Sequence, residues 1–510
     1  MKTKPHSWLL CCSVLAMLGL LLTTLGCTPE KEQKKKQQQT TKPDVPEKLF
    51  KNWPKPDLAL LISGEQHGYL LPCGCSRPQV GGLERRYNLL TKLRQAGWPV
   101  TAVDLGDIPQ VTGPRGLPNV QGLLKYKTSM QALKIMGYQA VGVGQYETSF
   151  GLLNTLGAFR LEDEHIGVLS ANLKEKENNF ASLVESSKVV KVPGSRLNLG
   201  VTSVMSPTVA KTVPDRTAQF GEDGKPLPKL LDTLGKNGAH VGVLLYQGTA
   251  AEAKALVKKY PQFHVVIHKS DDPEPPSQAT EVGNSHLISV GHKGKYVGIV
   301  GIYYTGNRAQ PFKVRYQLVS LTEDFLTEKG EKNPVLDLME KYTLKLKQQN
   351  YLSRYPRRKH PNQVAIPGRM PTYVGSAVCA KCHRREHKVW KDSKHSHAYD
   401  SLLTAKNPGN RQHDAECVVC HTVGFSYERG YTDATKTAHL KHVGCESCHG
   451  PGSEHIRNKY DEKWHKLMNP WRDLKGEVKK QQIDRFCQKC HDIDNDVHYK
   501  FEKRWPPIKH

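Results

Sequence analysis

The feature that most constrains this chain is a five-residue pattern, Cys-x-x-Cys-His, that occurs four times. The copies are Cys379-Ala-Lys-Cys382-His383, Cys417-Val-Val-Cys420-His421, Cys445-Glu-Ser-Cys448-His449 and Cys487-Gln-Lys-Cys490-His491. With 13 Cys and 23 His in 510 residues, chance would give on the order of 0.01 copies. Two thiols three positions apart can form thioether bonds with the two vinyl groups of one haem, and the adjacent His can bind its iron. The motifs therefore predict four covalent c-type haems, with the eight Cys as attachment sites and the four His as proximal ligands.

Zinc binding is the competing explanation for paired Cys, because two such pairs can hold one tetrahedral zinc ion. Zinc knuckles do not explain why a His follows every second Cys, so the pattern favours haem. Four haems within about 113 residues leave too little chain for an ordinary apolar core around each one. The macrocycles must then form much of the core themselves and lie close enough to exchange electrons. Electron transfer is therefore the predicted function.

Histidines outside the motifs are abundant in the same region. Fifteen of the 23 His lie between His360 and His510, and four of these belong to the motifs. The surplus suits a second axial ligand on several irons, or else a solvated surface.

Four stretches around the motifs carry a family resemblance. They are Val374-Gly-Ser ahead of the first motif, Trp390-Lys-Asp-Ser-Lys-His395, Cys417-x-x-Cys-His-x-x-Gly-Phe425 and Gly444-Cys-Glu-Ser-Cys-His-Gly-Pro-Gly452. Over about 140 residues the sequence resembles the cytochrome c-554 (cytochrome c-554/c-prime) family of tetrahaem cytochromes. The resemblance implies that His395 and His455 are distal haem ligands. Members can carry a further His just ahead of the fourth motif, which this chain lacks, so the distal ligand of the fourth haem stays open among His413, His439, His442, His465 and His498.

The first 56 residues read as an export signal and a tether. Lys2 and Lys4 precede an apolar run, Trp8–Leu22, that is short for a membrane span, and small residues follow it up to Cys27. Leu25-Gly26-Cys27 resembles a bacterial lipobox, although Thr24 stands where Leu is usual. We expect residues 1–27 to be a lipoprotein signal and Cys27 to be lipidated, with plain secretion as the alternative. The protein would then lie on the periplasmic side of a bacterial membrane, held by a flexible polar tether at residues 28–56.

Residues 57–321 have a different pattern. Seven short apolar runs alternate with helix-like segments; the runs are Leu58–Ile62, Val100–Leu105, Ala140–Val143, Ile166–Leu169, Leu197–Val204, Val241–Tyr246 and Val265–Ile267, and the clearest helices are Leu83–Gln95, Leu123–Ile135 and Ala251–Lys259. This alternation predicts an α/β domain with buried parallel strands. Three later runs, Leu287–Val290, Val297–Tyr304 and Val314–Val319, lie closer together, as in an antiparallel layer.

A basic linker, residues 322–370, connects this domain to a mostly helical, loop-rich haem domain, residues 371–510. The linker begins with a helix-like stretch, Pro334–Gln348, and carries eight Lys or Arg and no acidic residue from Lys341 to Met370. Such a run is a solvated face, or a surface for haem propionates, anionic lipid or an acidic partner.

Polar residues follow three of the predicted strands, in Glu65-Gln-His67-Gly, Asp104-Leu-Gly-Asp107 and Gly144-Gln-Tyr-Glu147. The series resembles the calcineurin-like metallophosphoesterases, and most closely the amino-terminal domain of 5′-nucleotidases. That family holds two metals with Asp-x-His-Gly, Gly-Asp, Gly-Asn-His-Glu/Asp, a lone His and Gly-His-x-His. By the resemblance, Glu65, His67 and Asp107 are the surviving ligands, while Asp104 is a structural strand-end residue.

The remaining ligand positions depart from the family pattern. Gln145 and Tyr146 replace Asn and His, Leu245-Tyr-Gln-Gly has no His, and Ile267-His-Lys-Ser-Asp-Asp replaces Gly-His-x-His. Three ligands cannot neutralise two metal ions about 4 Å apart. We therefore expect no dimetal phosphatase activity.

Cys73 and Cys75 are the thiols left after cleavage removes Cys11 and Cys12, lipid takes Cys27 and haem takes eight. No disulfide framework remains. With His67 and Glu65 they could hold a single soft metal ion or form a redox pair; alternatively they are two small loop residues.

The formal net charge of +25 raises the question of nucleic-acid binding. Residues 371–510 carry 25 Lys and Arg against 18 Asp and Glu, an excess that about eight propionates on four haems would offset. An exported protein also has little access to nucleic acid, so we expect redox partner proteins instead. The alternatives to electron transfer are an oxidoreductase that acts on a small nitrogen or sulfur compound at an open haem, and an active phosphoesterase coupled to a cytochrome.

Overall fold

A computed structural model describes residues 49–510, except residues 75, 161–165, 175–179, 181 and 271. These residues belong to one compact unit, Pro43–His510. The predicted signal, the lipidation of Cys27 and the side chain of Cys75 lie outside the described residues. Within the described ranges, no helix is long and apolar enough to cross a membrane.

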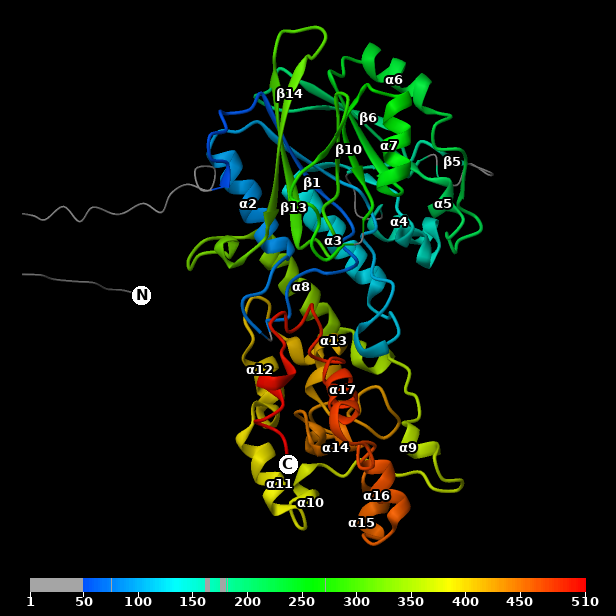
Figure 1. Ribbon diagram of the computed structural model, residues 1–510, viewed down its shortest axis with the longest axis vertical. Helices are drawn as coiled ribbons and strands as arrows, with labels where there is room; N and C mark the ends of the chain where they lie inside the picture. The colour runs from blue at the N-terminus through cyan, green and yellow to red at the C-terminus, as the bar shows by residue number, and fades with distance from the viewer. Residues whose placement is uncertain (1–48, 75, 161–165, 175–179, 181, 271) are drawn as a thin grey trace, which may run out of the picture. The chain divides into compact units, whose positions relative to one another are not determined.

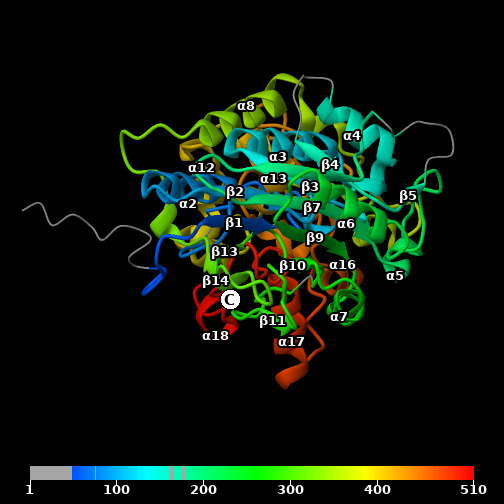
Figure 2. The same ribbon diagram turned by 90° about the horizontal axis from the view of Figure 1, so that it is seen from above.

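The first sheet has six strands in the order β14-β13-β1-β2-β3-β4. Figure 1 labels β14, β13 and β1, and Figure 2 labels all six. Their bounds are Leu58–Ser63 (β1), Val100–Asp104 (β2), Tyr138–Gly142 (β3), Gly167–Leu169 (β4), Tyr296–Tyr304 (β13) and Phe312–Ser320 (β14). Strands β1 to β4 run parallel. Strand β13 runs antiparallel to β1, and β14 runs antiparallel to β13, as the close spacing of these two runs predicts.

The second sheet also has six strands, in the order β11-β12-β10-β9-β7-β6. Their bounds are Ser187–Lys191 (β6), Asn198–Met205 (β7), Val241–Gln247 (β9), Phe263–His268 (β10), Thr280–Val282 (β11) and Ser285–Ile288 (β12), and a small ladder joins β5 (Leu173–Lys174) to β8 (Gln219–Phe220). The expectation for Leu287–Val290 was wrong, because β12 runs parallel to β10 and antiparallel only to the edge strand β11. The segment between β10 and β12 is long enough for the crossover that a parallel pair needs.

The two sheets lie face to face between two helical layers. Along β1, Leu58, Leu60 and Ile62 face the core between the sheets, while Ala59 and Leu61 face a second core under helices. Helices α2 (Leu83–Gln95), α3 (Gly122–Met136) and α8 (Pro334–Gln348) cover the first sheet, and α6 (Leu227–Lys236) and α7 (Ala250–Lys259) cover the second (Figure 2). The remaining short elements of this part are η1 (Pro114–Gly116), η2 (Tyr146–Phe150), α4 (Leu152–Arg160), α5 (Pro207–Ala210) and η3 (Glu323–Phe325). The predicted layered α/β class is confirmed.

Two segments that were expected outside this domain pack into its core. Phe50 is buried, and its ring lies 5.1 Å from those of Trp53 and Trp98, so the tether prediction is wrong from residue 50 onward. Helix α8 has the predicted bounds and starts where Asn333 accepts hydrogen bonds from the first-turn N–H groups of Val335 and Leu336. Its apolar face joins the core under α2 and α3, so the first half of the linker is part of the α/β layer.

The described chain from residue 351 onward consists of short helices joined by loops. They are η4 (Tyr351–Arg354), α9 (Pro361–Val364), α10 (Ser376–Cys379), α11 (Arg384–Asp392), η5 (Lys394–His397), α12 (Ala398–Thr404), η6 (Arg411–His413), α13 (Ala415–His421), η7 (Ala438–Leu440), α14 (Cys445–His449), α15 (Ser453–Arg457), α16 (Glu462–Met468), α17 (Gly476–Cys487) and α18 (Phe501–Arg504). A small apolar core that includes Tyr399, Val418 and Phe425 holds α12 and α13 together. The predicted helical, loop-rich class is confirmed.

Candidate haem centre and strand-end loops

Each Cys-x-x-Cys-His motif forms a helical turn. Helices α13 and α14 contain the second and third motifs whole. In the first and fourth motifs the His N–H donates to the carbonyl of the first Cys, at 2.9 Å for His383 and 3.0 Å for His491. Residues three and four apart lie on one face of a helix, so each turn presents two thiols and an imidazole to the same side.

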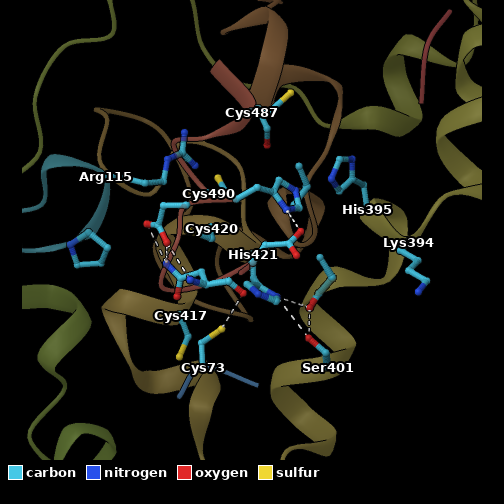
Figure 3. A pocket seen from close by; sticks show the side chains of 18 of the residues that line it. Cys73, Arg115, Lys394, His395, Ser401, Cys417, Cys420, His421, Cys487 and Cys490 are labelled. Atoms are coloured by element: carbon cyan, nitrogen blue, oxygen red, sulfur yellow. Dashed lines mark hydrogen bonds and ion pairs between the residues drawn. The ribbon is translucent and has the colours of Figure 1, made fainter. Parts of the chain in front are cut away.

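One cavity of about 1830 Å³ is lined by all four motif His and by seven of the eight motif Cys. The eighth, Cys382, is exposed. Figure 3 shows Cys417, Cys420 and Cys490 around this cavity together with His395 and His421. A site for one small ligand occupies roughly 300–1,000 Å³, so the cavity has room for several cofactors. The residues present therefore fit covalently attached haems.

The motifs lie beside one another in two pairs. The thiols of Cys379 and Cys445 are hydrogen-bonded, which places the first motif against the third. The thiols of Cys420 and Cys490 are also hydrogen-bonded, which places the second motif against the fourth. Groups attached at paired motifs would be close neighbours.

Three motif His face a second His ring. The ring centres of His383 and His455 are 6.1 Å apart, those of His491 and His395 are 6.2 Å apart, and those of His449 and His510 are 5.9 Å apart. Two imidazoles that bind one metal through Nε2, each at about 2 Å, have ring centres about 6 Å apart. The three pairs thus have the spacing of axial ligands on one iron.

Hydrogen bonds to Nδ1 orient the motif imidazoles. The Nδ1 atoms of His421 and His449 lie 2.5 Å from the carbonyl of Ala398 and 2.7 Å from that of Met468. Because a carbonyl only accepts, Nδ1 carries the proton in both rings and Nε2 keeps its lone pair for a metal. Burial lowers the pKa of both rings, which favours the neutral form that binds iron.

His491 differs because its Nδ1 donates to a carboxylate. Asp496 Oδ2 lies 2.9 Å away, and Arg504 holds the same carboxylate through bonds of 2.9 and 3.1 Å. Burial alone would raise the pKa of Asp496. The hydrogen bonds from Arg504 and His491 outweigh this effect, so the pKa lies below its ordinary value. Asp496 is therefore ionised at neutral pH and makes the His491 ring electron-rich.

Basic side chains of the α/β layers contact the helical part. Arg115, in η1, donates from Nη1 to the carbonyl of Val419 at 2.8 Å. Lys125 pairs with Glu416 at 2.5 Å, and Lys295 pairs with Asp494 at 2.7 Å.

The basic run from Lys341 to Met370 stacks on aromatic rings. The guanidinium groups of Arg354, Arg357 and Arg358 lie over the rings of Tyr351, Phe425 and Tyr427, respectively.

The ends of β1 and β2 hold the residues that resemble phosphoesterase ligands. Glu65, His67 and Asp107 all have positive φ, at 49°, 47° and 55°, a conformation that is common at functional sites. Asp107 forms an ion pair with Lys269, which lies in the segment where the resemblance implies Gly-His-x-His. Burial alone would lower the pKa of Lys269, but the nearby carboxylates of Asp107 and Glu65 raise it. A lysine cation thus neutralises Asp107.

Two further carboxylates near these loops are held by hydrogen bonds and charge within the fold. Glu147 accepts N–H bonds from Asp107, Ile108 and Gly144 at 2.9 to 3.1 Å, and burial raises its pKa to about 8. Asp104 accepts a bond from Ser63 at 2.5 Å and lies 3.8 Å from the guanidinium of Arg86, as a structural strand-end residue would. Among the residues that the structure describes, no three His, Cys, Asp or Glu are arranged to hold a metal ion.

Cys73 lies between the strand-end loops and the fourth motif. Its Sγ accepts a hydrogen bond from Gln79 at 3.4 Å and donates to the carbonyl of Asn495 at 3.6 Å. Because Cys75 lies outside the described residues, the soft-metal or redox site of Cys73, Cys75 and His67 stays a prediction.

Comparison with known proteins concerns the two parts separately. The family model described as cytochrome c554 and c-prime matches residues 378–450. Cytochrome c-554 of Nitrosomonas europaea is 30% identical over 134 residues, which cover 23% of this chain and 57% of that protein. A solved structure of reduced cytochrome c554 from the same organism covers 27% of this chain and 84% of its own, at 24% identity and a TM-score of 0.20. This chain thus spans little more than half the length of the curated cytochrome it matches.

The other part overlaps with a different class of solved structures. A 5′-nucleotidase precursor from Thermus thermophilus covers 57% of this chain and 59% of its own, at 18% identity and a TM-score of 0.47. An overlap of this size says nothing about activity. The chain joins a region similar to the multihaem cytochrome c554 to an α/β region similar to 5′-nucleotidases.

Within the cytochrome c554-like region, the structure brings both predicted distal residues, His395 and His455, to a motif His. His395 faces His491 of the fourth motif, whose ligand the sequence left open. No described ring pair joins a motif His to His413, His439, His442, His465 or His498; His465 packs instead against His455, at 5.1 Å. Sequence reasoning missed His510, because nothing around it resembles a ligand motif.

Proposed function

We propose that this chain is an exported tetrahaem c-type cytochrome that relays electrons through four covalently bound haems. The observation that carries the proposal is the set of three His pairs, each joining a motif His to a second His at about 6 Å. Bound haem supplies one-electron chemistry at its iron. Two axial imidazoles fill both open positions of an iron, which suits electron transfer better than catalysis at the metal.

The chain's own residues hold, orient and group the cofactors. The eight motif Cys provide covalent attachment, and the backbone carbonyls of Ala398 and Met468 fix the orientation of two motif imidazoles. The sulfur atom of Cys379 lies next to that of Cys445, and the sulfur atom of Cys420 lies next to that of Cys490, so the attachment sites are grouped in two pairs. Neighbouring attachment points favour a short relay over four independent centres.

The α/β layers are proposed to be inactive as a phosphoesterase. Asp107 pairs with Lys269, and a lysine ammonium can neither activate water nor bridge two metal ions. These layers would instead dock a redox partner protein, bind a substrate or carry a second redox site at Cys73.

Localisation follows from the proposed cofactor. Thioether attachment of haem in bacteria takes place after export, so we place the protein on the periplasmic side, anchored by lipid at Cys27. Redox proteins are its expected partners, and nucleic acid is not.

Replacing His395 or His455 with Ala tests the relay. Each variant should convert one low-spin iron to high-spin and raise its potential, because a neutral imidazole stabilises the ferric state. Electron paramagnetic resonance and a potentiometric titration of the purified holoprotein measure both effects. His397→Ala is the matched control, since His397 lies in the same short helix and its side chain is 67% exposed. Low-spin signals that stay unchanged in both variants would contradict the proposal.

A further inference from the structure

We propose that His510 is the distal axial ligand of the third haem, whose attachment sites are Cys445 and Cys448 and whose proximal ligand is His449. The inference rests on the proposed function, since it needs a haem at that motif. Neither the sequence motifs nor the family match, which ends at residue 450, assigns a role to His510.

The first observation is the spacing of the two rings. The ring centres of His449 and His510 are 5.9 Å apart, with an angle of 52° between the ring planes. The pairs that contain the two predicted distal ligands have distances of 6.1 and 6.2 Å and angles of 36° and 44°. The distance from His510 to the motif His of the third motif is therefore similar to the distances from His455 to the first motif His and from His395 to the fourth.

The second observation concerns the ring nitrogen that each His has available to bind iron. Nδ1 of His510 lies 2.9 Å from the carbonyl of Ile508, and Nδ1 of His449 lies 2.7 Å from the carbonyl of Met468. A carbonyl only accepts, so both Nδ1 atoms carry the proton and both Nε2 atoms keep the lone pair that binds iron. Both rings also line the large cavity of the motif Cys.

The segment that carries His510 is held in place by packing. Phe501 is buried, and its ring stacks on that of Trp505 at 5.8 Å. The N–H of Lys509 donates to the carbonyl of Trp505 at 3.0 Å, which continues the turn after α18 up to His510. Arg504 anchors α18 to Asp496. A ligand held this way loses little conformational freedom when it binds.

The anchor also links two haem sites. Asp496 accepts hydrogen bonds from both Arg504 and His491, the motif His of the fourth site. The distal side of the third site and the proximal side of the fourth therefore share one carboxylate.

The other aromatic ring near His449 cannot replace His510. The ring centres of Trp471 and His449 are 6.5 Å apart, but the indole N–H of Trp471 is a donor only and does not bind iron. Helix α17, which leads into the fourth motif, carries no His. Among the described ring contacts of His449, His510 is thus the one that offers an imidazole.

The test is His510→Ala in the full chain, purified with its haems, and His498→Ala is the matched control. His498 is an exposed His nearby that faces no motif His in the described structure. We expect four haems in both variants by mass spectrometry. In His510→Ala alone, one low-spin signal should become high-spin, and added imidazole should restore it. An unchanged low-spin spectrum in His510→Ala overturns the assignment.

A second variant covers the case in which His510→Ala does not fold. His510→Met keeps a ligand and should leave the iron low-spin at a higher potential, because a thioether ligand raises the potential of haem. An unchanged potential in His510→Met overturns the assignment of His510 and leaves the electron relay standing. Wild-type protein with zinc or without haem at the motifs overturns the proposed function instead.

Discussion

Single residues differentiate the haem sites through what each motif imidazole contacts. His421 and His449 donate to neutral carbonyls, whereas His491 donates to the ionised Asp496. A carboxylate partner pushes electron density onto the ring and so stabilises the ferric state. The fourth site should therefore have a lower potential than its ligands alone would give.

Asp496→Asn tests this effect. The amide carries no charge, so the potential of the fourth haem should rise by roughly 60 mV, the equivalent of a tenfold change in a one-electron equilibrium. A potentiometric titration followed by absorbance resolves the shift. The control is Asp473→Asn, which removes an exposed carboxylate of the same region. An equal shift in both variants would mean that only the net charge matters.

Residues that belong to a local motif could be predicted, whereas residues that act across the fold could not. The eight Cys and four motif His follow from spacing within one helical turn. His510 faces His449 from a segment that Arg504 anchors to Asp496, and no local pattern encodes that contact. Phe50 and Trp53 were assigned to the polar tether because the residues before them are polar, although their rings pack on Trp98.

At the scale of elements, helices with strong local signals were predicted well. The bounds of α2 and α8 match the expectation, because an apolar stripe and, in α8, an Asn cap with Pro in the first turn mark them. The direction of β12 was missed, because pairing depends on which strand the crossover reaches. The strand-end motifs located the loops after β1 and β2 but did not reveal the ion pair of Asp107 with Lys269.

That ion pair leads to a prediction about the strand-end loops. Purified protein with added manganese or zinc should not hydrolyse nucleotides above background, because Lys269 neutralises Asp107 and the metal-binding His of the family are missing. A release assay for inorganic phosphate, calibrated with an active 5′-nucleotidase, measures this. Turnover near the ordinary enzymatic median of roughly 10 per second would show that the loops still assemble a catalytic site.

At the scale of the whole molecule, the charge balance and the cofactors are connected. The chain carries a formal net charge of +25, and residues 371–510 have 25 basic against 18 acidic side chains. The propionates of four haems would offset about eight positive charges. Cations such as Arg115, whose Nη1 contacts the carbonyl of Val419 inside the second motif, suit a region that holds anionic cofactors.

Covalent attachment of four haems can be measured as the mass of the purified mature protein after extraction with acidified acetone, which removes only haem that is not covalently bound. We expect four haem masses per chain, and one haem on each peptide that contains Cys379, Cys417, Cys445 or Cys487. Zinc in place of haem, or motif peptides with unmodified cysteines, would contradict it.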